Sequence, residues 1–380
     1  MSMFNVTTEI EYGENALDHL KKKRWKKAFI VADPFVVSGG LIGHVTSRLQ
    51  SAGTRYVIFD EVVPDPPIEK IVSGVIRMLR EEPDCMIAVG GGSAIDTAKA
   101  MRLFASQMGL SGVWLIAVPT TSGTGSEVTS FAVVSDPAKG RKYPLVSSSM
   151  TPDEAILDEL MVKSVPAATT ADTGMDVMTH AIEAYVSTHH NEFSAALSEK
   201  AIEICNQFLV RSYMDNTDAH ARRKMHIASC MAGLAFNAAS LGLNHGMAHQ
   251  LGAQFHIPHG RANAVLLPHV VEYNCRIGTF DRSRKEYDPC VKRYCYIGQL
   301  IGVNTVNEVT TIHALIAYLN FMNHIMGIPA KVSEIVKVSE QEYMAKVPLM
   351  ARAALEDACT ATNPRKPTLE EVEDLYKKIW

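Results

Sequence analysis

One aspartate and several histidines lie at spacings that suit a metal site. Asp176 and His180 are four residues apart, which places both side chains on one face of a helix. His245 and His249 share a second helical face in the same way, and His259 follows soon after. Four of the 14 histidines fall between His245 and His259, so isolated core histidines are a poor explanation. One carboxylate with several imidazoles suits Fe(II), Zn(II), Mn(II) or Co(II), and the pattern alone leaves the ligand set open.

Two glycine-rich loops in the first half of the chain suit a nucleotide. Residues 90–93 read Gly-Gly-Gly-Ser and follow an apolar run, and residues 120–126 read Thr-Thr-Ser-Gly-Thr-Gly-Ser after another such run. Glycines allow close approach of the backbone, and the free N–H groups of a helix start favour a pyrophosphate. A tight strand-to-helix turn is the alternative for either loop. The pattern is not the G-x-G-x-x-G fingerprint, which disfavours an ordinary Rossmann fold.

Asp33 follows the first apolar run and precedes Pro34. A carboxylate at the end of that strand could accept hydrogen bonds from a ribose diol, and it would repel the 2′-phosphate of NADP. Asp33 therefore favours NAD. A turn or helix-capping aspartate is the alternative interpretation.

These residues must be positioned by two kinds of domain. Short apolar runs alternate with helical periodicity up to about residue 164, which indicates a parallel sheet covered on both faces. Helical periodicity then dominates, so we expect an α/β nucleotide-binding domain over 1–170 and an all-helical metal-binding domain over 171–380. The expected strands are 28–32, 56–59, 86–89 and 115–118, and the expected helices include 41–52, 68–79, 173–187, 195–210, 222–238 and 311–326.

The bulk properties exclude several classes of protein. A chain of 380 residues is too long for one compact core, which agrees with two domains. The net charge of −4 gives no electrostatic reason to expect nucleic acid or an anionic membrane as partner. No apolar run approaches the roughly 18 to 20 residues of a membrane span, and the N-terminus does not resemble a signal peptide. Seven cysteines without a CxxC pair suit reduced thiols, so we expect a cytoplasmic protein.

Long motifs give the chain a resemblance to a known family. They are DPF from Asp33, GGGSAIDTAKA from Gly90, PTTSGTGSEVTS from Pro119, GMDVMTHAIEAYVS from Gly174, GLNHGMAHQLGAQFHIPHG from Gly242 and TNPR from Thr362. Together they resemble the iron-dependent alcohol dehydrogenases, which share a fold with glycerol dehydrogenase and dehydroquinate synthase. The resemblance covers nearly the whole chain. It implies an NAD(H)-dependent enzyme with Fe²⁺, or Zn²⁺, that interconverts short-chain primary alcohols and aldehydes.

The resemblance also assigns roles to individual residues. It implies that His249 is a proton-relay group rather than a ligand, and that Lys142 lies near the active site, although a solvated loop lysine is the alternative. Phe131, Phe236 and Phe255 are candidates for the apolar wall of a substrate pocket, or ordinary core residues. The implied metal ligands are Asp176, His180, His245 and His259. The implied cofactor contacts are Asp33, Gly91, Gly92, Ser93, Asp96, Thr120, Thr121 and Ser122.

Within this family the chain is most similar to the 1-propanol dehydrogenases associated with bacterial microcompartments. The KYPL sequence from Lys142, the region around His226 and a short N-terminus carry this finer resemblance. It implies regeneration of NAD⁺ in or beside a microcompartment. The implied partners are other copies of the chain, as a dimer or larger oligomer, and a shell protein or a co-encapsulated aldehyde dehydrogenase.

Other functions compete with this interpretation. A polyol dehydrogenase of the same family, acting on glycerol, 1,2-propanediol or 1,3-propanediol, would use the same residues. A cyclase would need a basic pocket, but only Lys142 and Arg261 border the motifs. A metal-dependent hydrolase would have no use for the two glycine loops. A structural microcompartment component would leave the ligand set unexplained. The alcohol dehydrogenase explains both halves, because a metal-bound alcohol oxygen loses its proton more easily and a metal-bound carbonyl is polarised.

Overall fold

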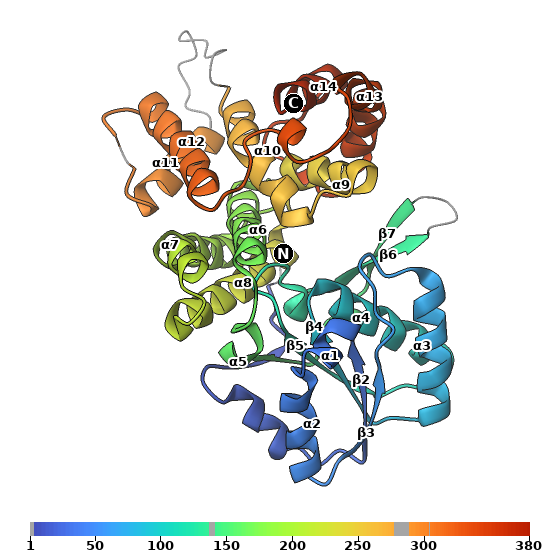
Figure 1. Ribbon diagram of the computed structural model, residues 1–380. Helices are drawn as coiled ribbons and strands as arrows, with labels where there is room; N and C mark the ends of the chain where they lie inside the picture. The colour runs from blue at the N-terminus through green and yellow to red at the C-terminus, as the bar shows by residue number, and fades with distance from the viewer. Residues whose placement is uncertain (1–3, 137–140, 277–288, 304) are drawn as a thin grey trace. The chain divides into compact units, whose positions relative to one another are not determined.

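The computed structural model describes residues 4–136, 141–276, 289–303 and 305–380 (Figure 1). The chain separates into two compact units, Met1–Val165 and Pro166–Trp380. The first unit is an α/β structure and the second is helical, as the sequence predicts. The predicted domain boundary at residue 170 falls inside the first helix of the second unit.

A parallel sheet forms the centre of the first unit. Its order in the described residues is β1-β8-β5-β4-β2-β3. The four strands expected from the sequence are confirmed as β2, β3, β4 and β5, whereas β1 and β8 were not predicted. The strands are β1 (Glu9–Tyr12), β2 (Lys27–Ala32), β3 (Arg55–Phe59), β4 (Cys85–Gly90), β5 (Trp114–Pro119) and β8 (Glu154–Leu157).

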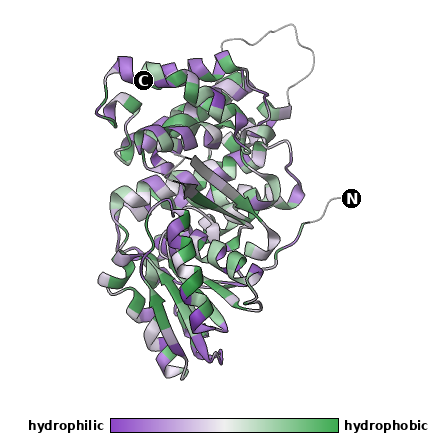
Figure 2. Ribbon diagram, turned by 90° about the vertical axis from the view of Figure 1, so that its right-hand side faces the viewer, coloured by the Kyte–Doolittle hydropathy of each residue, from purple (hydrophilic) through white to green (hydrophobic). Residues whose placement is uncertain are grey.

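Both faces of this sheet are buried, which explains the apolar strands in Figure 2. On β2, Phe29 and Val31 face the core under α3 (Ile68–Glu81) and α4 (Gly92–Gln107). Ala28 and Ile30 face the opposite core, which includes residues of α2 (Ile42–Ser51). The predicted helices over 41–52 and 68–79 are therefore confirmed. The alternation of side chains along each strand supplies both cores.

The strand order brings three predicted site loops to one edge of the sheet. Strand β2 pairs with β3 on one side and with β4 on the other, so the strand order reverses between β3 and β4. Asp33, Gly91 and Thr120 directly follow the ends of β2, β4 and β5. The Thr120 N–H donates to the Gly90 carbonyl at 3.0 Å, which joins two of these ends. Ligands of open α/β sheets bind at such a reversal of strand order, beyond the carboxyl ends.

The strands β6 (Phe131–Asp136) and β7 (Arg141–Val146) pair antiparallel and form a hairpin that is separate from the parallel sheet. Lys142 lies in β7 opposite Ser135. Its side chain lies outside the described part of the chain, so its active-site role stays a prediction.

A buried lysine anchors this hairpin to α4. The ammonium of Lys99 donates to Ser126 Oγ and Thr129 Oγ1, both at 2.9 Å, and to the Phe131 carbonyl at 3.0 Å. Ser126 in turn donates to Asp96 Oδ1 at 2.6 Å, and Asp96 Oδ2 accepts the Val133 N–H. Burial lowers the pKa of Lys99 to about 8, against the opposing effect of Asp96 and Glu127. Lys99 and Asp96 thus hold the polypeptide that follows the second glycine loop.

We expect Lys99→Met to lower the free energy of unfolding by about 3 kcal/mol, because three acceptors and the Asp96 charge lose a buried partner. Denaturation in urea measures the change. Lys200→Met is the matched control, since exposed Lys200 forms a surface ion pair with Glu203 and its loss should change stability by less than about 1 kcal/mol. Equal stability of the two variants would contradict the anchoring role.

Nine helices make up most of the described part of the second unit. The predicted helices are confirmed as α6, α7, α8 and α12. The central helix, α6, packs against α7, α8 and α10 and is buried over most of its length. The helices are α6 (Ala167–Val186), α7 (Glu192–Met214), α8 (Ala219–Ala239), α9 (Leu243–Phe255), α10 (His259–Asn274), α11 (Pro289–Leu300), α12 (Glu308–Ile325), α13 (Glu340–Glu356) and α14 (Leu369–Lys378).

Membrane-spanning potential is limited to one bent pair. Among the described residues no single helix has the length and hydropathy needed to cross a membrane, whereas α8 and α9, bent by 108°, meet that test only when taken together.

Candidate metal centre

Helix α6 carries the first two predicted ligands. Asp176 and His180 are 2% and 4% exposed and lie on one face, as their spacing predicts. The ring of His180 stacks on Phe236 of α8, with centroids 4.5 Å apart. Phe236, a candidate for a substrate pocket wall, therefore contacts a predicted ligand. This stacking restricts the orientation of the imidazole.

A sharp turn brings the other two predicted ligands to the same place. His245 lies in the first turn of α9, and His256, the residue after α9, has a left-handed φ of 54°. Pro258 then precedes α10, and His259 is the first residue of that helix. Proline is favoured at a helix start because it needs no N–H partner there. The turn directs His259 back toward His245.

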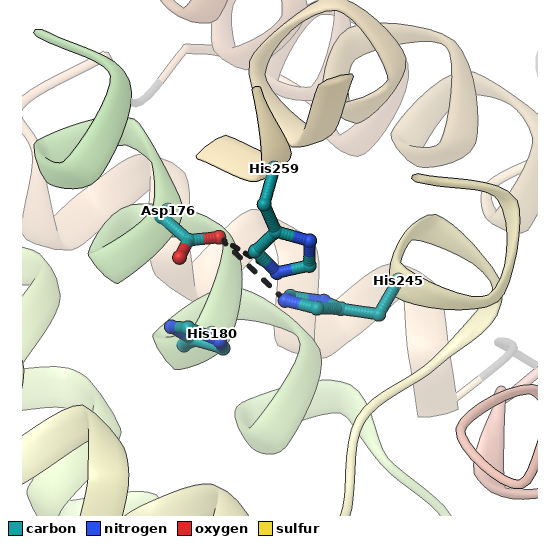
Figure 3. Close-up of side chains that lie close together, drawn as sticks. All are labelled: Asp176, His180, His245 and His259. Atoms are coloured by element: carbon teal, nitrogen blue, oxygen red, sulfur yellow. Dashed lines mark ion pairs between the residues drawn. The ribbon is translucent and has the colours of Figure 1, made fainter. Parts of the chain in front are cut away.

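The four predicted ligands converge in one cluster (Figure 3). One ligand atom from each of them lies within 4.8 Å of all the others. Asp176 Oδ1 is 3.7 Å from His245 Nε2 and 3.5 Å from His259 Nε2. The rings of His180 and His245 stack with centroids 4.6 Å apart. One carboxylate and three imidazoles therefore face a common point, a donor set that fits a divalent transition metal such as iron or zinc.

The electrostatics of the cluster suit a cation. Burial alone would raise the pKa of Asp176, but the imidazoles of His180, His259 and His245 hold that pKa far below its usual value. Burial likewise opposes a charged His245, yet Glu183 and Asp176 raise the pKa of His245 to about 9. The two carboxylates therefore stabilise positive charge at this buried point, where an unpaired carboxylate would be costly.

Asn263 is part of this cluster although the sequence analysis did not identify it. Its amide nitrogen donates to Asp176 Oδ1 at 2.7 Å and lies 3.1 Å from His245 Nε2 and 3.2 Å from His259 Nε2. Its amide oxygen accepts a hydrogen bond from Asn244 Nδ2 at 2.9 Å, which fixes the orientation of the amide. The available signal was its spacing of four residues from His259 on α10.

His249 lies beside the cluster but not in it. Its ring stacks on His259 with centroids 5.4 Å apart, and its Nδ1 is 2.8 Å from Asp357 Oδ2. Burial would raise the pKa of Asp357, but His249 and the Cys359 backbone lower it to about 2. Because that carboxylate can only accept, Nδ1 of His249 is the donor in this hydrogen bond. His249, Asp357 and Cys359 form a second group with ligand atoms within 4.8 Å of one another.

The other aromatic candidates lie elsewhere. Phe255 stacks on Tyr343, with centroids 5.3 Å apart, within the core of the second unit. Phe131 belongs to the first unit, where Lys99 approaches its ring at 5.9 Å. Neither contact includes a predicted metal ligand.

The predicted nucleotide residues gather at the sheet edge of the first unit. A Cβ on Gly91 would lie 3.3 Å from Thr121 Oγ1, and a Cβ on Gly92 would lie 2.8 Å from Thr124 Cγ2, so the two glycine loops are in contact. Gly92 and Ser93 begin the 16-residue helix α4, whose first N–H groups favour an anion. Ser122 lies within the second loop and is half-buried.

Asp33 serves in part as the helix cap that was the alternative prediction. Its Oδ1 accepts the Val36 N–H at 2.8 Å, whereas its Oδ2 lies 3.3 Å from the position that a Cβ would take on Gly90. Oδ1 therefore caps the helix, whereas Oδ2 faces the glycine loop. Both oxygens of Asp96, in contrast, accept hydrogen bonds from Ser126 and Val133 inside the unit.

Comparison with known proteins identifies the family. The model described as iron-containing alcohol dehydrogenase matches residues 7–159. The model described as Fe-containing alcohol dehydrogenase family, C-terminal, matches residues 170–380. Together they cover most of both units.

Individual relatives agree with the family models. The 1-propanol dehydrogenase PduQ of Citrobacter freundii is 41% identical, over 100% of both chains. The NADPH-dependent butanol dehydrogenase of Clostridium saccharobutylicum is 37% identical, over 100% of this chain and 98% of that protein. A solved 1,3-propanediol oxidoreductase has a TM-score of 0.90 and 32% identity over the whole of both chains. The chain therefore belongs to the iron-containing alcohol dehydrogenase family, and it is an oxidoreductase that interconverts alcohols and aldehydes.

Proposed function

We propose that Asp176, His180, His245 and His259 hold a catalytic Fe²⁺ ion, which Zn²⁺ can replace. The convergence of their four ligand atoms within 4.8 Å carries this proposal. When bound, such an ion polarises the oxygen of the alcohol or aldehyde and stabilises its negative charge. Three neutral imidazoles and one carboxylate leave the site a net positive charge, which favours an alkoxide.

NAD(H) is the proposed hydride carrier, bound at the sheet edge of the first unit. Gly91, Gly92 and Ser93 offer backbone N–H groups to the pyrophosphate, and Asp33 Oδ2 accepts from the ribose diol. Thr120, Thr121 and Ser122 complete the proposed direct contacts. Asp96 is proposed to act through Ser126, which donates to its Oδ1.

His249 is the proposed proton relay. Asp357 accepts its Nδ1–H, so the imidazole can take up or release a proton at Nε2 without changing its orientation. Lys142 is a further proposed contributor, through its positive charge near the reacting oxygen.

The proposed substrates are short-chain primary alcohols and their aldehydes, with 1-propanol and propanal first. Similarity to PduQ over the full length of both chains supports this choice. It also supports a role in or beside a bacterial microcompartment, as a homo-oligomer that regenerates NAD⁺ next to an aldehyde dehydrogenase. A polyol such as 1,3-propanediol is the second candidate, because the solved 1,3-propanediol oxidoreductase has nearly the same fold.

A substrate panel tests this choice. We would measure kcat/KM of the Fe(II)-loaded enzyme for propanal, acetaldehyde and butanal with NADH, and for 1-propanol, 1,3-propanediol and glycerol with NAD⁺. We expect propanal to exceed the other aldehydes and 1-propanol to exceed both polyols. A preference for either polyol over 1-propanol would replace the first candidate with the second.

We expect Asp33→Asn to reduce kcat/KM with NADH by about tenfold, because a charge-assisted hydrogen bond to the ribose is worth about 1.5 kcal/mol or more. With NADPH the same variant should be faster than wild type, since asparagine does not repel a phosphate. Asparagine can still cap α1 (Pro34–Ser38), so the fold should persist. Steady-state kinetics with both cofactors measures the change. An unchanged NADH-to-NADPH ratio would rule out the ribose contact.

A further inference from the structure

The helix that carries His245 has no cap of its own. The residue before α9 is Gly242, which has no side chain to accept from the first N–H groups. Instead, the Leu243 N–H donates to Asn363 Oδ1 at 3.2 Å, and the Asn244 N–H donates to Glu183 Oε1 at 2.7 Å. Both acceptors come from remote parts of the chain. The first turn of α9 is therefore fixed by long-range contacts and not by a local side-chain cap.

Gly242 is the residue that lets both acceptors approach. A Cβ at this position would lie 2.6 Å from Glu183 Oε1 and 3.0 Å from Asn363 Oδ1. Real Cβ atoms essentially never come as close as the first of these distances. Its φ of −149° suits any residue, so the close approach is the reason for a glycine here.

The second oxygen of Glu183 forms a hydrogen bond with the side chain of His245. Glu183 Oε2 lies 2.5 Å from His245 Nδ1, and both side chains are almost fully buried. Since both oxygens of Glu183 accept, Nδ1 of His245 is the donor in this contact, and Nε2, 3.7 Å from Asp176 Oδ1, is the nitrogen left for a metal. Glu183 thus holds the helix with one oxygen and the tautomer of its histidine with the other.

Asn363, from the TNPR motif, is itself held firmly. Its amide nitrogen donates to Asn274 Oδ1 at 2.8 Å and to the Arg365 carbonyl at 2.6 Å. Arg365 donates in turn to the Tyr273 carbonyl at 2.7 Å. The TNPR segment is therefore attached to the end of α10, the helix that begins with His259, as well as to the start of α9.

We propose that Glu183 and Asn363 are positioning residues for the metal ligand His245. This proposal rests on the proposed metal site. Glu183 sets the tautomer of the imidazole, and the two acceptors together set the position of the first turn of α9. This assigns a purpose to TNPR, which contributes none of the four ligands. Groups of this kind, behind a ligand, commonly change metal affinity by about 10- to 100-fold.

Glu183→Gln tests control of the tautomer. The glutamine oxygen can still accept from the Asn244 N–H, but its NH₂ group would face His245 Nδ1 and favour the tautomer with a proton on Nε2. We expect metal-free protein of nearly unchanged melting temperature that binds Co(II) about 10- to 100-fold more weakly, with an altered Co(II) absorption spectrum. Glu154→Gln is the matched control, because Glu154 is also a buried glutamate beside a histidine, His19, but belongs to the first unit.

Asn363→Ala tests the second acceptor. It should weaken Co(II) binding by about tenfold or more. Asn307→Ala is the control: it removes the cap of α12, so it should lower stability without changing Co(II) affinity. Affinity within twofold of wild type in both Glu183→Gln and Asn363→Ala would overturn the proposal, as would equal losses in the two control variants. Failure of the wild-type protein to bind Co(II) or Fe(II) would instead overturn the proposed metal site.

Discussion

Replacing Asp176 with asparagine is expected to reduce kcat/KM for propanal by about a thousandfold, and to release most of the bound iron. Asp176 is the anionic member of the proposed ligand set, and His245 and His259 both lie within 4 Å of its Oδ1. A metal that polarises the carbonyl contributes several kcal/mol to transition-state stabilisation, and each 1.36 kcal/mol corresponds to a factor of ten in rate. Steady-state kinetics and iron analysis after gel filtration, both under anaerobic conditions, measure the two effects.

Asp172→Asn is the matched control for this experiment. Asp172 lies one turn earlier on the same helix and accepts from Arg261 Nε at 3.0 Å, outside the ligand cluster. The control should keep its iron and most of its activity. If Asp176→Asn retained wild-type iron content and rate, Asp176 would not be a ligand.

The second large effect is expected from Gly260→Ala, next to His259. A Cβ at Gly260 would lie 2.1 Å from the Asp172 carbonyl oxygen and 3.3 Å from the Asp176 Cβ. The obstacle is backbone, so α10 would have to move away from α6, and His259 would move with it. Overpacking of this kind costs about 1–3 kcal/mol of stability and occasionally more. We expect a lower melting temperature together with at least about a tenfold loss of iron affinity.

Gly252→Ala separates this effect from a general response to alanine. Gly252 lies inside α9, where a Cβ would meet only the Ile257 carbonyl at an ordinary 3.6 Å. Alanine in a helix interior is favoured over glycine by up to about 1 kcal/mol, so this variant should be as stable as wild type or more so. Similar behaviour of the two variants would contradict the close contact of α10 with α6.

Much of the fold was predictable because local patterns determine it. The apolar runs that became β2, β4 and β5 are buried on both faces, so their composition alone identifies them. Asp176 and His180 share a helix, and a spacing of four residues is a reliable sign of a shared face. Strand β1 was missed because it is a short edge strand with a mixed burial pattern.

The residues around the ligands were not predictable because their partners are distant in sequence. Glu183 reaches His245 across 62 residues, and Asp357 reaches His249 across 108. No periodicity relates such positions. Asp33 shows a different limit, since one carboxylate can cap a helix with one oxygen and still present the other to a ligand. The helix cap and the ribose contact, which were alternative predictions for Asp33, are therefore compatible with each other.

Stepwise anaerobic addition of Fe(II) to metal-free protein tests the central claim most directly. Bound iron and the rate of NADH oxidation with propanal would be measured on the same samples. We expect the rate to rise in proportion to bound iron and both to level off at a single iron per chain. Full activity in the metal-free protein, or a rate that does not follow bound iron, would contradict a catalytic metal at Asp176, His180, His245 and His259.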